Sequence, residues 1–293
     1  MAKFKQIIER ELICEKQILF NKGADYNQAV FLAGGSGSGK SFASKRFMQG
    51  EKFRRFDVDR WKKGFLDFAD ETDQYPELEG LDLQNPSDVT KLHMFVKDKG
   101  INNRFVNNVL KNNEAGRLPN VLFDVTLKEA SKLHTFLPLL QKSGYKPQNI
   151  HLVWVLANYE IAVKRNRDRD RIVPEDILLQ THEGAASTIT DLVDGENLPR
   201  GMDGSVHAIL NNREHTVFYS DENGEPIEVR GQPIGSDEQN VETKKVVEDF
   251  QYITLKRRGD SFRSSLEIKE TLAQWIRRNA PKTIAAWKNL TAV

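Results

Sequence analysis

The chain has 293 residues, 39% of them hydrophobic, which is enough to bury the core of one large domain or two smaller ones. Its 43 basic and 42 acidic residues leave a net charge of +1, so bulk charge neither requires nor excludes a nucleic-acid partner. The single cysteine, Cys14, cannot form an internal disulfide. Since the sequence also shows no signal segment and no apolar run of about 18 residues, we expect a cytoplasmic protein with no membrane span.

The first part of the chain contains a phosphate-binding motif. A charged, amphipathic pattern predicts an N-terminal helix within residues 1–23, and the apolar run 29–33 predicts the first strand. The segment that follows matches the template G-x-x-x-x-G-K-[ST], and a helix-compatible segment comes after it, which is the context that a P-loop requires. The residues expected to bind nucleotide are Gly34, Gly35, Ser36, Gly37, Ser38, Gly39, Lys40, Ser41 and Phe42.

Each residue type in this loop has a physical task. Glycines let backbone N–H groups wrap around a phosphate, and the N-terminus of the next helix adds its positive dipole end. Lys40 is expected to reach the β and γ phosphates of ATP, and the Ser41 hydroxyl to coordinate Mg²⁺. A glycine-rich linker, the alternative, does not usually lie between an apolar strand and Gly-Lys-Ser.

Two aspartates end the second predicted strand, residues 53–59. A carboxylate there can orient an acceptor hydroxyl and take its proton during phosphoryl transfer. If the strand geometry persists, Asp57 and Asp59 point to the same face, and we prefer Asp59 as the general base, with Asp57 as a metal-binding or supporting residue. The alternative is a polar strand end that caps the next helix. The acidic segment 71–88 predicts a loop, and a helix is expected from about 88 to 114, with a possible break at Gly100.

Two further strands are predicted from apolar runs at 120–124 and 151–156. Asp124, at the end of the first run, has the position at which a carboxylate holds Mg²⁺ through water, or else it caps the turn that follows. Thr126 is expected to cap a helix over 127–143.

An arginine-rich helix follows the fourth strand. Arg165 and Arg169 share one face at i, i+4 spacing, and arginines placed in this way can neutralise the charge of a transferring phosphoryl group. A solvated helix with Arg–Asp pairs is the alternative. His182, farther on, is expected to have a structural or substrate-orienting role rather than a catalytic one.

The C-terminal region changes in character. Residues 216–229 have the pattern of a hairpin with its turn at Asn223-Gly224, and the chain after 231 is mostly helical. Scattered basic residues there can grip phosphates, which makes nucleic acid a possible partner. These residues are Lys256, Arg257, Arg258, Arg263, Arg277, Arg278, Lys282 and Lys288.

Together these motifs resemble the small P-loop kinases that include zeta toxins, polynucleotide kinases and adenylylsulfate kinase. In that group a strand-end D-x-D-x-x-R motif follows the P-loop, and the matching stretch here is Asp57-Val58-Asp59-Arg60-Trp61-Lys62. The resemblance implies that Asp59 is the general base and that Lys62, in place of the group's arginine, and Arg60 contact the substrate. It also implies that Arg165 and Arg169 belong to a lid that binds the β and γ phosphates, and that 215–219 is the last core strand.

The sequence therefore predicts an α/β, three-layer P-loop NTPase fold with a mostly parallel sheet and a helical C-terminal appendage. The expected organisation is an N-terminal helix (1–23), a kinase core (24–230) with a substrate-side insertion (64–118) and an arginine-rich lid (159–173), and the appendage (231–293).

The expected function is transfer of the γ-phosphoryl group of ATP, with Mg²⁺, to a hydroxyl of a nucleotide, a nucleotide sugar or a nucleic acid. The alternative is a nucleotide-driven ATPase or switch protein that acts through a partner. It is disfavoured because Asp124 is followed by Val125 and not by a glutamate. The acceptor and the oligomeric state stay open.

Overall fold

A six-stranded sheet forms the centre of the protein, in the order β2-β3-β1-β4-β5-β8. The structure, a computed structural model, describes residues 18, 20–22, 24–48, 53–72, 74–100, 104, 117–169, 172–211, 221, 223–225, 228–230, 243–245 and 251–279. The first five strands in the sheet order are parallel, and β8 is antiparallel to β5. The strands are β1 (Ala29–Ala33), β2 (Phe53–Asp57), β3 (Asn120–Asp124), β4 (Ile150–Ala157), β5 (Val206–Asn211) and β8 (Gln251–Lys256).

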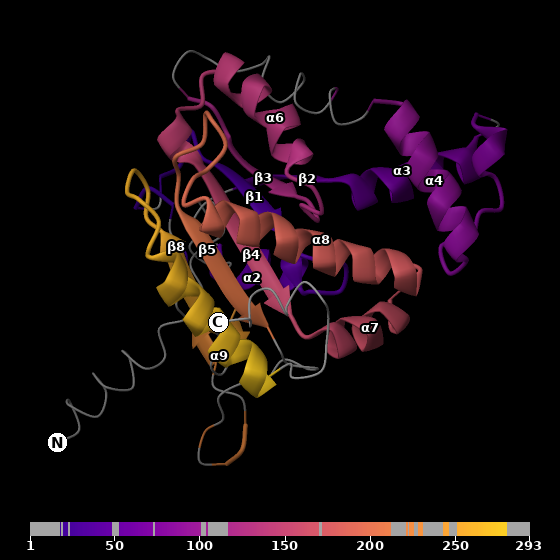
Figure 1. Cartoon of the computed structure of the whole chain (residues 1–293). Helices are drawn as coiled ribbons and strands as arrows, with labels where there is room; N and C mark the ends of the chain where they lie inside the picture. Colours follow the sequence, from indigo (N-terminus) through magenta and orange to yellow (C-terminus); the bar gives the residue numbers. More distant parts are fainter. Residues whose placement is uncertain are drawn as a thin grey trace.

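Helices cover both faces of this sheet (Figure 1). One face, which includes Phe31 of β1, packs against α6 (Ser131–Lys142), α8 (Glu175–Asp194) and α9 (Ser265–Asn279). The opposite face, which includes Leu32, packs against α2 (Lys40–Phe47). Because neighbouring residues of β1 enter different cores, the whole strand is buried, as the continuous apolar run predicts. The three-layer α/β fold is therefore confirmed.

A helical projection extends beyond the carboxyl ends of β2 and β3 (Figure 1). It consists of α3 (Val58–Glu71), the 3₁₀ turn η1 (Pro76–Leu78) and α4 (Pro86–Asp98). The projection has an apolar cluster of its own, built around Leu66, Leu78 and Leu92. It begins at Val58, before the predicted insertion (64–118), and the rest of it lies within that insertion.

Short elements complete the described chain. A 3₁₀ turn η2 (Pro147–Asn149) precedes β4, and α7 (Tyr159–Arg167) follows it. β6 (Glu228–Arg230) and β7 (Thr243–Lys245) form a two-stranded antiparallel sheet. None of the helices in the part of the chain that the structure describes is long and apolar enough to cross a bilayer.

Two predicted element boundaries are wrong. The second strand does not extend to residue 59, because it ends at Asp57 and α3 begins at Val58. Thr126 does not cap a helix: α6 begins only at Ser131, after Ala130, which makes no side-chain cap. Leu127 has a φ of 51°, in the left-handed region, so the chain turns there before the helix can start.

One parallel strand was not predicted: β5 is formed by Val206–Asn211, which is buried along its whole length. The segment 215–219, predicted as the last core strand, lies outside the described residues. Asn223-Gly224 does form a turn, but β6 pairs with β7, and the other predicted hairpin arm, 216–220, also lies outside the described residues. Most of the predicted N-terminal helix lies outside them as well.

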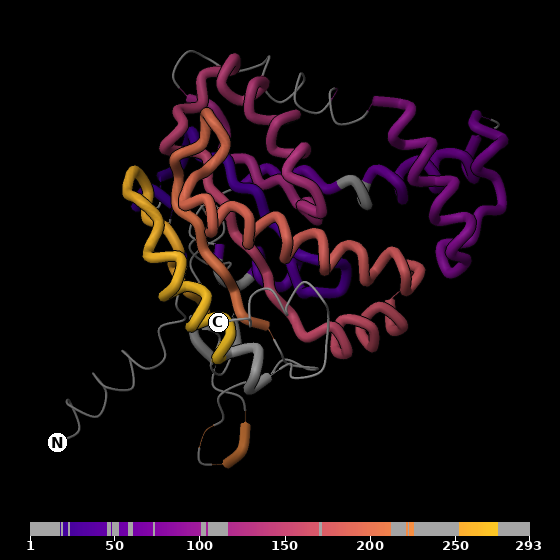
Figure 2. Tube along the Cα trace, viewed as in Figure 1, coloured from indigo at the N-terminus to yellow at the C-terminus, as the bar shows by residue number. Residues whose placement is uncertain are grey.

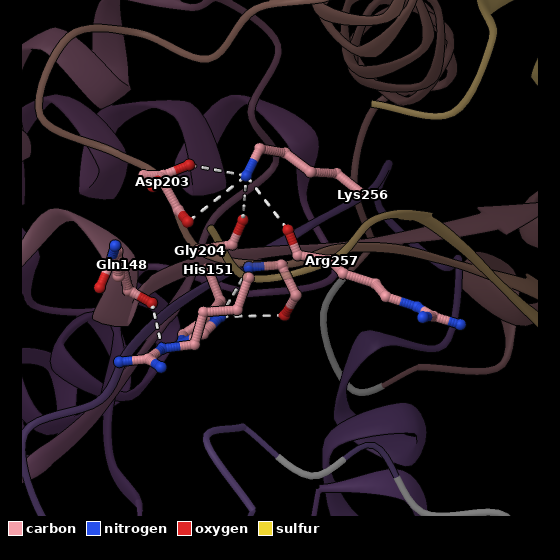
Figure 3. A network of polar contacts seen from close by, with 8 residues as sticks. Gln148, His151, Asp203, Gly204, Lys256 and Arg257 are labelled. Carbon is pink, nitrogen blue, oxygen red and sulfur yellow. Dashed lines mark hydrogen bonds and ion pairs between the residues drawn. The ribbon is translucent and has the colours of Figure 1, made fainter. Parts of the chain in front are cut away.

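The C-terminal region adds a strand as well as a helix. The helix α9, the yellow coil in Figure 2, agrees with the predicted helical character. The strand β8 was not predicted, and it pairs with β5 in the main sheet. Lys256, at the end of β8, is only 6% exposed. Its Nζ donates to Asp203 Oδ1 at 2.8 Å and to the carbonyl oxygens of Gly204 and Arg257 (Figure 3). These bonds fix the end of β8 to the loop that precedes β5.

Candidate active site

The phosphate-binding loop lies between the carboxyl end of β1 and the start of α2, as predicted. Gly37 and Gly39 have φ values of 74° and 91°, which other residues rarely adopt. A Cβ at Gly37 would lie 2.7 Å from the Ala162 carbonyl oxygen of α7, and one at Gly39 would lie 2.4 Å from the Asn211 Nδ2. The glycines therefore let α7 and the end of β5 approach the loop directly.

Lys40 lies over the loop. Its Nζ donates to the carbonyl oxygens of Gly34 at 2.8 Å and Gly35 at 3.0 Å. The backbone of Lys40 opens α2, so the ammonium and the helix N-terminus are on the same side of the loop. Phe42, in the first turn of α2, packs its side chain against the apolar core of the adjacent face.

The Ser41 hydroxyl and Asp124 converge, although they lie on different elements. The register of β2 and β3 pairs Asp57 with Asp124, and Arg55 on the same strand contacts both carboxylates. Arg55 Nη2 also donates to Ser41 Oγ at 2.9 Å. A hydroxyl and a carboxylate that meet at one point are a donor set that suits Mg²⁺, which keeps phosphate oxygens and waters as its other ligands. Among the described residues, no group of three or more acidic, histidine or cysteine side chains is placed to hold a metal ion.

The two predicted lid arginines lie on either side of the loop. Arg169 Nη1 donates to Ser36 Oγ at 3.2 Å, and Arg165 Nη2 donates to Asn211 Oδ1 at 3.4 Å. Arg165 also lies beside Gly39, with its Nη1 3.4 Å from the position of a Cβ there. Arg167, between them in sequence, instead pairs with Glu175 at the surface. The structure thus brings Arg165 and Arg169, from the end of α7 and the turn after it, to the P-loop.

Helix α8 holds the loop at Ser36. The Ser36 N–H donates to Thr181 Oγ1 at 3.1 Å, and His182 Nε2 lies 2.7 Å from the Ser36 carbonyl oxygen. Burial lowers the pKa of His182 to about 4, so the ring is neutral at pH 7 and Nε2 carries the proton that it donates. The ring also packs edge-on against Tyr159. This geometry gives His182 a structural role, one of the two roles expected for it.

The remaining predicted residues lie at the start of α3. Asp59 and Arg60 belong to its first turn, and their side chains are not among those described. Asp57 and Asp59 do not share a strand face, because the backbone is helical from Val58 onward. Lys62, expected to contact substrate, is 7% exposed.

The predicted nucleic-acid contact residues are largely engaged within the protein where their side chains are described. Lys256 is buried, Arg258 donates to the Gln148 carbonyl oxygen and to Asn149, and Arg263 pairs with Glu267. The other side chains of that set, except Arg257, lie outside the described part of the chain: Arg277, Arg278, Lys282 and Lys288.

Some contact residues at the loop were not singled out from the sequence. Thr181 and Asn211 come from elements distant in the chain, and only the fold shows that they touch the loop. Arg55 has a weaker sequence signal, since it lies two residues before Asp57 and therefore on the same face of β2.

The sheet, the loop and the helix after it define a P-loop nucleotide-binding protein. The chain belongs to the zeta toxin family, whose sequence model matches residues 13–223. Family membership and the P-loop together support a nucleotide-binding, kinase-like phosphotransferase. Comparison with curated proteins gives no match.

Several solved structures are similar to this chain. A structure of AvrRxo1-ORF1:-ORF2 with ATP is 13% identical with a TM-score of 0.47, and the match covers 89% of this chain and 65% of that chain. A chain of the PezAT chromosomal toxin-antitoxin system of Streptococcus pneumoniae is 16% identical with a TM-score of 0.41, with coverage of 71% and 76%. A gluconokinase from Sinorhizobium meliloti is 14% identical with a TM-score of 0.30, with coverage of 62% and 84%.

Proposed function

We propose that this protein is an ATP-dependent kinase that transfers the γ-phosphoryl group to a hydroxyl of a nucleotide, a nucleotide sugar or a nucleic-acid end. The observation that carries the proposal is the meeting of Lys40, Arg165 and Arg169 around one phosphate-binding loop. Three cations on separate positions of the loop can surround a phosphoryl group as its charge redistributes.

In this mechanism the loop amides and Lys40 bind the phosphates, and the two lid arginines close over the group in transfer. Ser41 and Asp124 would hold Mg²⁺, which supplies neutralisation of the β and γ phosphate charge. Asp59 orients the acceptor hydroxyl and accepts its proton. The preference for Asp59 over Asp57 as the base is drawn from the resemblance of the stretch Asp57-Val58-Asp59 to the family motif.

The helical projection is the proposed acceptor side of the site. Its loop is bonded to the lid segment, since the Ile172 N–H donates to the Leu83 carbonyl oxygen at 3.2 Å and Gln84 Nε2 donates to the Arg169 carbonyl oxygen at 3.1 Å. An acceptor held against the projection therefore lies next to the segment that carries Arg169. The nucleotide-like class of the acceptor is part of the proposal and is drawn from the resemblance to the small P-loop kinases.

The first test is transfer of label from γ-labelled ATP, with Mg²⁺, to pools of nucleosides, nucleotide sugars and DNA or RNA ends. Label that moves to one pool supports the kinase and identifies its acceptor class. Label released only as free phosphate contradicts it and favours the ATPase or switch protein. Lys40→Ala is expected to reduce transfer by at least about 100-fold, because it removes a cation from the phosphate site. Lys45→Ala, an exposed lysine of the same helix, is the matched control.

A second test separates the two aspartates. Asp59→Asn is expected to leave ATP affinity within a few fold and to reduce transfer by about 10²–10⁴-fold, the usual contribution of a general base. Asp57→Asn is the comparison, and retained transfer in Asp59→Asn together with loss in Asp57→Asn would move the base to Asp57. Equal loss of ATP binding in both variants would make both residues structural.

A further inference from the structure

Arg55 occupies a position unlike that of an ordinary surface arginine. It lies on β2, and its side chain is 17% exposed. A single nitrogen, Nη2, donates to Ser41 Oγ at 2.9 Å, pairs with the Asp124 carboxylate and lies 3.7 Å from Asp57 Oδ2. One positively charged nitrogen therefore lies where three oxygens from three elements meet.

Two of these three oxygens belong to the residues proposed to hold Mg²⁺. Mg²⁺ binds oxygen at about 2.0–2.1 Å and requires near-octahedral geometry. A metal ion between Ser41 and Asp124 would have to share that space with Nη2, against the repulsion of two like charges. The guanidinium and the metal cannot both use these oxygens in the arrangement that the structure shows.

The guanidinium is also incompletely satisfied in this place. Its Nε is buried and is one of two buried side-chain polar atoms without a hydrogen-bond partner among the described residues. A buried N–H without an acceptor is unfavourable, so the pocket does not hold the side chain with all its donors paired. This lowers the free energy needed for Arg55 to leave.

We propose that Arg55 is an internal competitor of the metal ion. Its guanidinium holds Ser41 and Asp124 while no metal is bound, and it is displaced when Mg²⁺ enters with the nucleotide. Arg55 thereby sets the metal concentration that the site requires. This inference rests on the proposed function in one respect, the assignment of Ser41 and Asp124 to the metal.

Binding of Mn²⁺ to the full chain without nucleotide, followed by the electron paramagnetic resonance signal of the free ion, tests the proposal directly. Mn²⁺ prefers the same oxygen ligands as Mg²⁺. Arg55→Met removes the competitor and is expected to tighten Mn²⁺ binding by about 10-fold or more, the scale of a charge-assisted hydrogen bond. Arg54→Met is the matched control, because Arg54 is its exposed neighbour on the same strand and the change in charge is identical. It is expected to bind Mn²⁺ as the wild type does.

Equal or weaker Mn²⁺ binding by Arg55→Met than by the wild type overturns the proposal. Asp124→Asn in the Arg55→Met background is expected to remove the gain, and a gain that persists also overturns it, since the ion would then bind elsewhere. If Arg55→Met does not fold, Arg55→Gln is used, since it also removes the positive charge, and binding no tighter than that of the wild type has the same meaning. Binding of a fluorescent ATP analogue with Mg²⁺ is measured in parallel. If neither the wild type nor any variant binds the analogue, the proposed function is contradicted, and the Mn²⁺ result still tests the role of Arg55 separately.

Discussion

Replacement of Gly35 by alanine is expected to disturb the P-loop through one identifiable contact. The new Cβ would lie 2.2 Å from His182 Cδ2, 2.3 Å from Cγ and 2.4 Å from Nε2. Carbon atoms pack at about 3.5–4.0 Å, so the overlap exceeds an ångström. Gly35 does not have a positive φ, so an alanine there meets no backbone strain and the histidine ring is the obstacle.

The ring cannot retreat without loss of its own contacts. His182 Nε2 is bonded to the Ser36 carbonyl oxygen at 2.7 Å, and the ring packs against Tyr159. Overpacking of this kind destabilises a protein by about 1–3 kcal/mol. At roughly 2–4 °C per kcal/mol, we expect Gly35→Ala to lower the melting temperature by about 2–12 °C and to weaken ATP binding.

The explanation is tested by a double-mutant cycle with His182→Ala. That variant alone removes the hydrogen bond to Ser36 and is expected to be less stable by about 1–3 kcal/mol. It also opens the space that the new Cβ needs, so the double variant is expected to be more stable than the sum of the two changes predicts by about 0.5–3 kcal/mol. The melting temperature and the affinity for a fluorescent ATP analogue are measured for the wild type, the two single variants and the double variant.

Gly64→Ala is the control for the change from glycine to alanine. Gly64 is exposed on α3 and has no atom within 4 Å of a new Cβ, so the variant is expected to be slightly stabilised by the better helix propensity of alanine. Additive effects of Gly35→Ala and His182→Ala, within about 0.5 kcal/mol, would refute the argument that the ring is what excludes a side chain at position 35.

Two further predictions concern stability. Burial lowers the pKa values of three histidines, His151 to about 3 and His182 and His207 to about 4. A histidine in the unfolded chain has a pKa near 6.5, so below that pH the unfolded state binds protons that the folded state does not. The free energy of unfolding therefore falls between pH 6.5 and about 4, by roughly 1.4 kcal/mol per pH unit for each histidine. Urea midpoints that are the same at pH 7.5 and pH 5.5 would contradict this. Lys256→Met is expected to lower the free energy of unfolding by about 1–3 kcal/mol, because it leaves the oxygens of Asp203 and Gly204 without their donor. Arg257→Met, at the exposed neighbouring position, is the control and is expected to change the melting temperature little. Equal effects of the two variants would count against the role assigned to Lys256.

The parts of the fold that the sequence predicts well are local in origin. The first, third and fourth core strands are continuous apolar runs, and the P-loop has its own template. β5 has a similar apolar run in Val206–Leu210, interrupted by His207, and was not predicted. β8 depends on an antiparallel pairing with β5 across residues 212–250, which no local pattern specifies.

The residues of the candidate site also divide into those that local motifs predict and those that only the assembled fold brings to the loop. The positions of Lys40 and Ser41 follow from the P-loop motif. Arg165 and Arg169 do approach the loop, but they do not share a helix face as the i, i+4 spacing predicts, because α7 ends at Arg167 and Arg169 lies in the turn after it. The contacts of α8 with Ser36 could not be predicted from the sequence, because a threonine and a histidine on an amphipathic helix have no pattern that distinguishes a contact with a loop from packing in the core. The place of Arg55 depends on the register between β2 and β3, which only the assembled sheet defines.

The late arrival of β8 has a consequence for synthesis on the ribosome. β5 is paired on one side by β4, and its other edge is covered by a strand that is translated only after residues 212–250. Translation proceeds at about 5–20 residues per second. The outer edge of β5 in the nascent chain therefore stays unpaired for seconds before β8 emerges from the ribosome. An uncovered edge of this kind can pair with other chains. A chain shortened to the segment that the family model matches, 13–223, would keep that edge permanently, and we expect it to aggregate where the full chain does not.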